Sequence, residues 1–226
     1  MKENCLSKNV LWHGGLFLVI SIITMLLSKL LPYPIFLIKD GIIETLLIFG
    51  GIFILQKNNF EDTKTNVGKV LVSSILATII FYVLEWLVAF VFNFIFGIFP
   101  TSSVIIVILN IITTLITYFL WFFIYITLCK IIFKPDNRYI ALKKNIVISL
   151  IVLIIFSLVA GIIYSISQII ALQMLAQISN DGNEMGFILG IMEMSSGWDL
   201  TYLIILVKSV IMAILSLGFM KQSSAD

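Results

Sequence analysis

The chain has 226 residues, of which 61% are hydrophobic and 12% are charged, and its formal net charge is +2. An average soluble domain has about 45–50% apolar and about 25% charged residues. A soluble domain of this length could not bury so much apolar surface. The composition therefore excludes a soluble globular protein and predicts that lipid is the solvent for most of the chain.

Six apolar runs are long enough to cross a bilayer, whose core of about 30 Å needs roughly 20 residues of helix. They cover residues 10–31, 35–55, 67–99, 104–133, 145–178 and 200–220. Helices satisfy their own backbone groups in lipid, so continuous apolar runs favour helices. The sequence thus predicts an all-α integral membrane protein, with residues 1–226 forming one polytopic domain, a bundle of six transmembrane helices.

The third, fourth and fifth runs are much longer than a bilayer requires. A long apolar helix either tilts strongly or projects beyond the hydrocarbon. We expect one of these two arrangements for each of the three helices.

Basic residues gather in alternate loops. Lysine and arginine are frequent in segments 56–69 and 130–144 and absent from segments 100–103 and 179–199. Basic loops stay in the cytoplasm, so we predict that both termini are cytoplasmic. Lys29 and Lys39, beside the first outer connection, are exceptions. Compact loops and the abundance of lysine and isoleucine favour the inner membrane of a bacterium.

Glu85 lies deep in the third run, where a charge costs about 2.5–3.5 kcal/mol on insertion scales. Three explanations stay open: Glu85 is protonated, it forms an ion pair, or it faces a water-filled path. Lys208 lies at a similar depth in the sixth run and is the partner that we predict for Glu85. Such a pair would hold the third and sixth helices together.

Asp40 and Glu44 are four residues apart, so they share one face of the second helix. If this helix starts near Ile35, Glu44 lies deep; if it starts near Gly41, Asp40 lies at the outer interface. The prolines just upstream favour the later start. Two carboxylates could bind a cation, but cations want several oxygen ligands, so the favoured interpretation is an interfacial helix end.

Small and polar residues follow one face of the fifth run at helical spacing. They are Asn145, Ser149, Ser157, Gly161, Ser165 and Gln168. Small residues four apart let membrane helices approach closely, and polar side chains can hydrogen-bond across the contact. Helix packing is the favoured interpretation, and the lining of a polar path is the alternative.

Catalytic sets are missing from the sequence. The chain has one histidine, His13, which we expect on the surface near the start of the first span. The sequence contains no H-E-x-x-H motif, no P-loop and no cysteine–histidine metal set. We therefore predict no enzyme activity, catalytic residue, metal or cofactor. The basic segments indicate membrane topology and contact with anionic lipid, not nucleic-acid binding.

The leading functional prediction is a permease, or the membrane subunit of a transport complex, for a small molecule, ion or peptide. Its candidate substrate path combines the intramembrane polar residues, which are Glu85, Lys208, Asp40, Glu44, Ser157, Ser165 and Gln168. Besides the lipid bilayer, a cytoplasmic ATPase or second membrane subunit could dock on segments 56–69 and 130–144. This layout matches six-span transporter subunits by fold-level analogy alone.

The alternative prediction is an accessory, immunity or assembly factor that does not transport. Such a protein would act through protein contacts made by its membrane-embedded polar residues and by the acidic segment 179–199. The two predictions differ in one structural requirement. A permease needs its polar residues to line one cavity, whereas an accessory factor needs only a packed bundle with a contact face.

Overall fold

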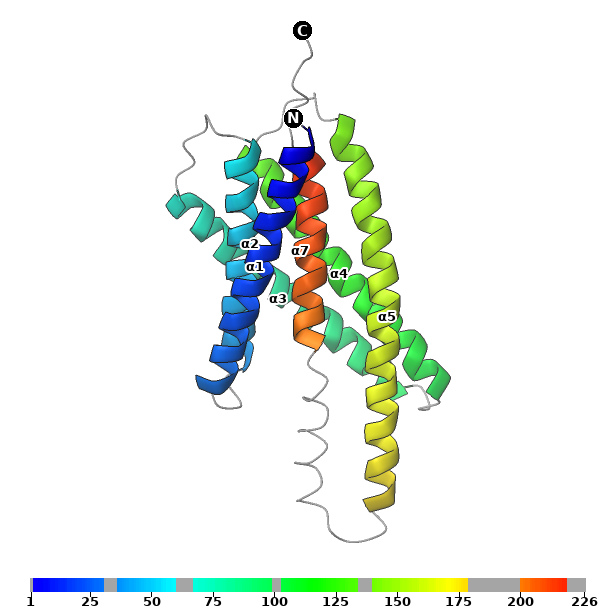
Figure 1. Ribbon diagram of the computed structural model, residues 1–226. Coiled ribbons are helices and arrows are strands. Elements are labelled where there is room, and N and C mark those ends of the chain that lie inside the picture. The colour runs from blue at the N-terminus through cyan, green and yellow to red at the C-terminus, as the bar shows by residue number, and fades with distance from the viewer. Residues whose placement is uncertain are drawn as a thin grey trace.

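The computed structural model describes residues 2–30, 36–59, 67–98, 103–133, 140–178 and 200–218, and all of them are helical. The helices are α1 (Lys2–Leu30), α2 (Phe36–Asn59), α3 (Val67–Ile98), α4 (Ser103–Phe133), α5 (Ile140–Ile178) and α7 (Leu200–Gly218) (Figure 1). The predicted all-α fold is confirmed, and most helix ends lie within a few residues of the predicted ends. The acidic segment 179–199 and the prolines of the connections lie outside the described residues.

Five of the helices, α1, α3, α4, α5 and α7, are long and apolar enough to cross a membrane. α2 is the exception among the described helices. Its 24 residues would reach about 36 Å at 1.5 Å per residue, but it carries Lys39, Asp40, Glu44 and Lys57. The bundle of membrane-spanning helices is thus supported for five helices, and a crossing by α2 stays a prediction.

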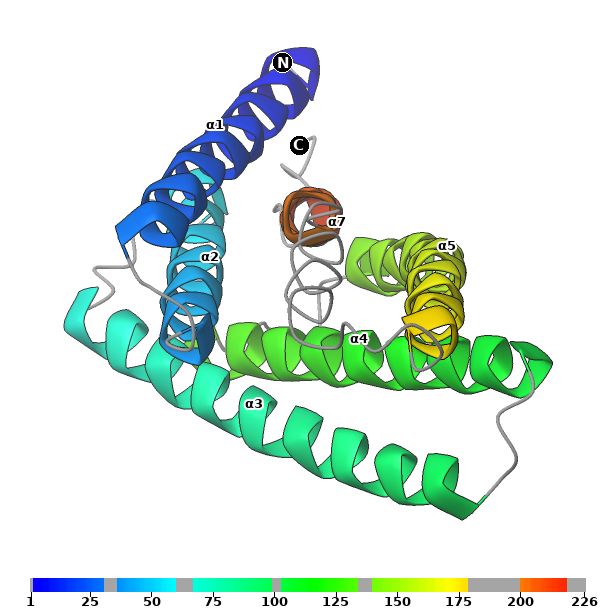
Figure 2. The same ribbon diagram turned by 90° about the horizontal axis from the view of Figure 1, so that it is seen from below.

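α7 occupies the centre of the bundle. Seen along its axis, α7 has α1 and α2 on one side, α4 on a second and α5 on a third (Figure 2), and it packs against α1, α2 and α5. In the apolar stretch of α7, 44% of the residues are buried, whereas 17% are buried in the apolar stretches of α1, α3 and α4. A residue of α7 can therefore contact several other helices at once.

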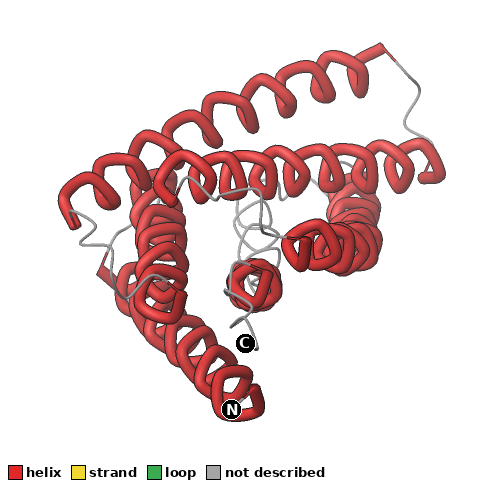
Figure 3. Tube along the Cα trace, turned by 90° about the horizontal axis from the view of Figure 1, so that it is seen from above, coloured by secondary structure: helices red, strands yellow, loops and turns green. Residues whose placement is uncertain are grey.

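α3 and α4 form a separate layer on one side of the bundle, as the view from above shows (Figure 3). Both run steeply inclined to α7 (Figures 1 and 2). α5 instead extends beyond the start of α7 (Figure 1). α3 and α4 are thus inclined to α7, and α5 extends past it; tilt in a bilayer or projection beyond it stays a prediction for all three helices.

The helices alternate in direction, so α1 begins and α7 ends at the same end of the bundle, here called the proximal end (Figure 1). The apolar core is concentrated toward this end. It includes Ile52 and Leu55 of α2, Trp121 and Tyr125 of α4, and Met212 of α7, all almost fully buried. The Trp121 and Tyr125 rings stack with centroids 5.6 Å apart. The opposite, distal half is packed less completely.

Large apolar side chains cover the outside of the bundle. Leu11, Phe123 and Trp86 are 75%, 71% and 66% exposed, and many other large apolar residues are exposed beside them. Soluble monomers rarely expose apolar patches larger than a few hundred Å². This surface therefore fits a lipid environment, as the composition predicts.

Candidate functional site

A cavity of about 1540 Å³ lies between α2, α3, α4 and α7 in the distal half of the bundle, with Tyr164 of α5 at its edge. Apolar and aromatic side chains form much of its wall. Its charged residues are Asp40, Glu44, Glu85 and Lys208. Four of the predicted path residues therefore line one cavity.

Glu44 and Lys208 form a buried ion pair inside this cavity. Lys208 Nζ lies 2.5 Å from Glu44 Oε2, and the Trp121 indole N–H donates a hydrogen bond to Glu44 Oε1. The Lys208 ammonium also lies 5.2 Å from the centroid of the Phe81 ring and 5.0 Å from that of Trp121. The pair thus gathers side chains from α2, α3, α4 and α7 around one ammonium group.

The predicted ion pair between Glu85 and Lys208 is wrong, because Lys208 binds Glu44. α2 packs directly against α7, whereas α3 packs mainly against α2 and α4. α2 also begins at Phe36 and not near Gly41. The later start, which the sequence favoured, is wrong as well, and Glu44 lies more than two turns inside the helix.

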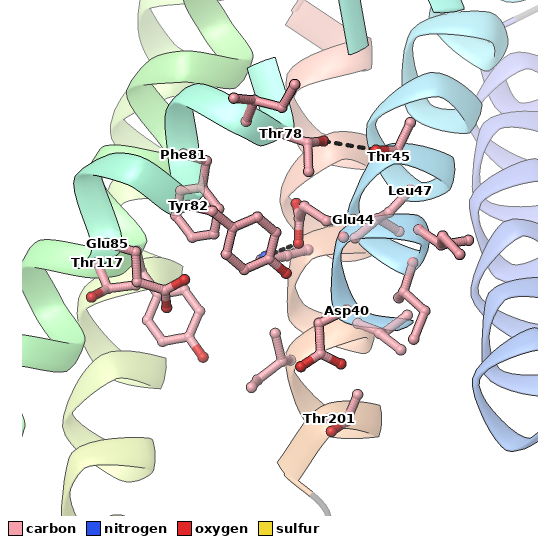
Figure 4. Close-up of a pocket in the computed structure, with 18 of the residues that line it drawn as sticks. Asp40, Glu44, Thr45, Leu47, Thr78, Phe81, Tyr82, Glu85, Thr117 and Thr201 are labelled. Carbon is pink, nitrogen blue, oxygen red and sulfur yellow. Dashed lines mark hydrogen bonds and ion pairs between the residues drawn. The ribbon is translucent and has the colours of Figure 1, made fainter. Parts of the chain in front are cut away.

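Glu85 lines the same cavity from α3 and is half-buried. In Figure 4 it lies beside Thr117, across the cavity from Glu44 and Asp40 of α2. No described side chain forms a hydrogen bond or ion pair with Glu85. Among its electrostatic neighbours are Lys208, Glu44 and Asp40. The Glu85 carboxyl group thus faces a cavity and forms no ion pair with a described residue; its protonation and a water-filled path stay predictions.

Asp40 has a different environment from Glu44, although they share a helix face. Lys39 Nζ lies 3.9 Å from Asp40 Oδ1 and donates a hydrogen bond of 3.5 Å to Ser28 Oγ of α1. Among the residues that the structure describes, no cluster of three histidine, cysteine, aspartate or glutamate side chains could hold a metal ion. Asp40 thus lies at the edge of the cavity near the start of α2.

The described residues of the small and polar face of α5 pack against neighbouring helices and are not among those that line the cavity. Ser157 and Ser165 are fully buried, and each donates a hydrogen bond to a carbonyl of its own helix, those of Leu153 and Gly161. Asn110 of α4 donates a hydrogen bond of 3.3 Å to Ser165 Oγ. The favoured packing interpretation agrees with these contacts. The side chain of Gln168 lies outside the described part of the chain.

Trp121 is a site residue that the sequence did not single out. Trp121 is 1% exposed and binds Glu44. Residues 114, 118, 121, 125 and 129 recur at helical spacing along α4 and are all buried. This periodicity was the signal that could have placed Trp121 inside the bundle.

A second polar group joins α1 to α7 near the proximal end. Asn9 Nδ2 donates to the Ala213 carbonyl at 3.0 Å, and Ser216 Oγ donates to Asn9 Oδ1 at 2.6 Å. His13 lies one turn further along α1 and is 3% exposed. The expectation of a surface histidine is therefore wrong. Neither ring nitrogen of His13 has a hydrogen-bond partner among the described residues.

Together, the apolar helices, the exposed apolar surface and the charged cavity define a polytopic α-helical membrane protein. No family model matches the chain, and comparison with curated proteins and with solved structures finds no similar protein.

Proposed function

We propose that the protein is a permease, or the membrane subunit of a transport complex, that binds its substrate in the distal cavity. The cavity carries this proposal. Charged side chains within a membrane are costly and usually face one another or a water-filled space. A pair that only joined helices would need no cavity, yet Glu44 and Lys208 lie in the wall of one of about 1540 Å³. Ligand sites of small molecules are commonly about 300–1,000 Å³, so this cavity has enough room for a small-molecule substrate.

We further propose that the proximal end faces the cytoplasm of a bacterial cell and that the cavity opens toward the outside. The basic segments support this orientation. Segment 56–69 joins α2 to α3 and segment 130–144 joins α4 to α5. The ends of α2 and α4 lie at the proximal end, where α1 begins (Figure 1). Basic connections favour the cytoplasmic side.

The energy for transport would come from a partner. The described helices account for most of the chain, and the sequence has no P-loop. Segments 56–69 and 130–144 are the docking positions that we propose for a cytoplasmic ATPase, because both are basic and join helices at the same end. A second membrane subunit is the other partner to look for.

Cysteine labelling in cells tests the proposed function. We would introduce Thr117→Cys into a Cys5→Ser background, since Cys129 is buried. If the cavity opens in turn to each side of the membrane, a membrane-impermeant maleimide should label position 117 in intact cells and also in inside-out vesicles. The matched control is Ser157→Cys, whose parent side chain is fully buried outside the cavity, and it should stay unlabelled. Labelling from one side alone would contradict a permease.

One observation favours the alternative, an accessory, immunity or assembly factor. The outer face of α3 exposes a stack of aromatic rings, in which Trp86 and Phe90 lie 5.8 Å apart. Such a face could pack against another membrane protein. Purification in mild detergent, followed by mass spectrometry, separates the candidates. A stoichiometric ATPase supports transport, whereas a non-transporter bound through α3 and lost in Phe90→Ala, a change outside the cavity lining, supports the alternative.

A further inference from the structure

We propose that the cavity binds an organic cation, an ammonium or similar group carried on an apolar or aromatic body, with Glu85 as its counter-charge. This inference rests on the proposed function, since it names the substrate class of the same cavity. Four features of the site carry it. They are the way in which the cavity holds Lys208, the surroundings of the Glu85 carboxyl group, the charge balance of the wall, and the shape and lining of the cavity.

Lys208 shows how this cavity holds a cation. Its ammonium group lies 2.5 Å from a carboxylate oxygen of Glu44 and about 5 Å from two aromatic rings, those of Phe81 and Trp121. A ring face attracts a cation within about 6 Å of its centroid, most strongly where water is excluded. The Lys208 ammonium group inside this bundle is therefore bound by one carboxylate and two aromatic rings.

Glu85 offers the same combination without a protein cation. Its carboxyl group lines the cavity, and no described residue forms an ion pair or hydrogen bond with it. Tyr82 and Tyr118 also line the cavity, and both are electrostatic neighbours of Glu85. Thr117 lies beside Glu85 (Figure 4). A ligand ammonium at Glu85 would thus meet a carboxylate, two phenol rings and a hydroxyl group.

The charge balance of the wall selects against anions. Three carboxyl groups and one ammonium group line the cavity, namely Asp40, Glu44, Glu85 and Lys208. The Glu44 carboxylate already balances the charge of the Lys208 ammonium group, so Lys208 attracts an anionic ligand only weakly. Like charges in a low-dielectric site repel strongly, and an anion in the cavity would have to approach the carboxyl group of Glu85, since Asp40 already has Lys39 at 3.9 Å.

The shape and lining of the cavity select an organic cation over a metal ion. Ca²⁺ and Mg²⁺ need about six or more oxygen ligands close together, and the described residues contain no three clustered metal-binding side chains. The cavity is far larger than an ion, and rings such as Trp86 and Tyr164 line it alongside aliphatic side chains. Apolar walls with a few placed polar groups are typical of sites for organic ligands.

Calorimetry with two ions of the same shape and opposite charge tests the proposal. The purified protein in detergent would be titrated with tetraphenylphosphonium and with tetraphenylborate, with empty micelles as the blank. We expect saturable binding of the phosphonium and at least tenfold weaker binding of the borate. Glu85→Gln should weaken phosphonium binding by tenfold or more, and Glu85→Asp, which keeps the charge, by less than fivefold.

Matched controls keep the result interpretable. Ser157→Ala changes a buried side chain outside the cavity and should leave the affinity unchanged. Glu85→Gln should elute and melt like the parent, since no described partner of Glu85 is lost. Equal binding of both ions, no saturable binding of the phosphonium, or an unchanged affinity in a folded Glu85→Gln variant would each overturn the cation assignment.

The two proposals can fail separately. If the cation assignment fails while Thr117→Cys is labelled from both sides, the permease proposal stands with another substrate class. If phosphonium binding depends on Glu85 but position 117 is labelled from one side alone, the cavity is a cation-binding site in a protein that does not transport.

Discussion

The ion pair between Glu44 and Lys208 makes each partner dependent on the other. Lys208→Met would leave the Glu44 carboxylate buried beside Trp121 without a counter-charge. Removing one partner of a buried pair typically costs about 3–5 kcal/mol, whereas replacing both can be nearly neutral. We expect Lys208→Met to lower the apparent melting temperature in detergent strongly, and Glu44→Gln combined with Lys208→Met to recover most of it. Equal melting temperatures for the single and double variants would show that the pair is not coupled.

His13 presents the opposite case, a buried polar group without a described partner. A buried polar group that makes no hydrogen bond costs about 1–3 kcal/mol. We therefore expect His13→Leu, of similar size, to keep or raise the melting temperature. Asn9→Leu is the comparison, because Asn9 bonds to Ala213 and Ser216 and its loss should lower the melting temperature. A lower value for His13→Leu would mean that the ring has a bonding role.

The sequence predicted which polar side chains lie inside the bundle better than it predicted which residues they contact. Glu44, Glu85 and Lys208 stand out in apolar runs, and all three line the cavity. Which carboxylate meets Lys208 depends on which helix packs beside α7. Gly51 helps to decide this, because a Cβ at that position would collide with Met212 of α7 and lie 3.0 Å from Tyr125 Oη. No hydropathy pattern reports such a contact.

At the scale of the helices, Gly161 controls the close approach of α5 to α4. A Cβ on Gly161 would lie 2.7 Å from Ile111 Cα, a backbone atom that cannot move aside easily. Overpacking of this kind costs about 1–3 kcal/mol. We expect Gly161→Ala to lower the melting temperature. Gly15→Ala on α1, where a Cβ meets nothing within 4 Å, should be neutral or slightly stabilising, and similar effects of the two changes would contradict the close contact.

Most helix ends could be predicted from the sequence because apolar runs often end where charged and turn-forming residues begin, but α1 and α5 start at Lys2 and Ile140, before the predicted residues 10 and 145. α3 is predicted at residues 67–99 and found at Val67–Ile98. The inclination of α3 and α4 could not be predicted, since their length allows tilt or projection equally. Packing decides it, through contacts between helices such as the hydrogen bond of 3.1 Å between Thr45 of α2 and Thr78 of α3.

For the whole molecule, the orientation in the membrane and the crossing by α2 can be tested together. Single cysteines would replace Lys64, between α2 and α3, and Ser102, between α3 and α4. If α2 crosses, an impermeant maleimide should label position 102 in intact cells and position 64 only after the cytoplasmic side is exposed. Labelling of position 64 in intact cells would show that α2 does not cross or that the orientation is reversed. The native Cys5, at the start of α1, distinguishes these two results, because it stays unlabelled in intact cells if α2 does not cross and is labelled if the orientation is reversed.

The ion pair between Glu44 and Lys208 can form only late in the synthesis of the protein. Glu44 and Lys208 are 164 residues apart in the sequence, so a ribosome synthesises most of the chain before the partner of Glu44 exists. Until α7 arrives, α2 carries a carboxyl group that lipid tolerates poorly. We therefore expect the completed α7, through Lys208, to add a late stabilisation of α2 to the earlier packing of α2 against α1 and α3. A chain that stops before α7 should be recognised as unfinished and degraded by membrane proteases.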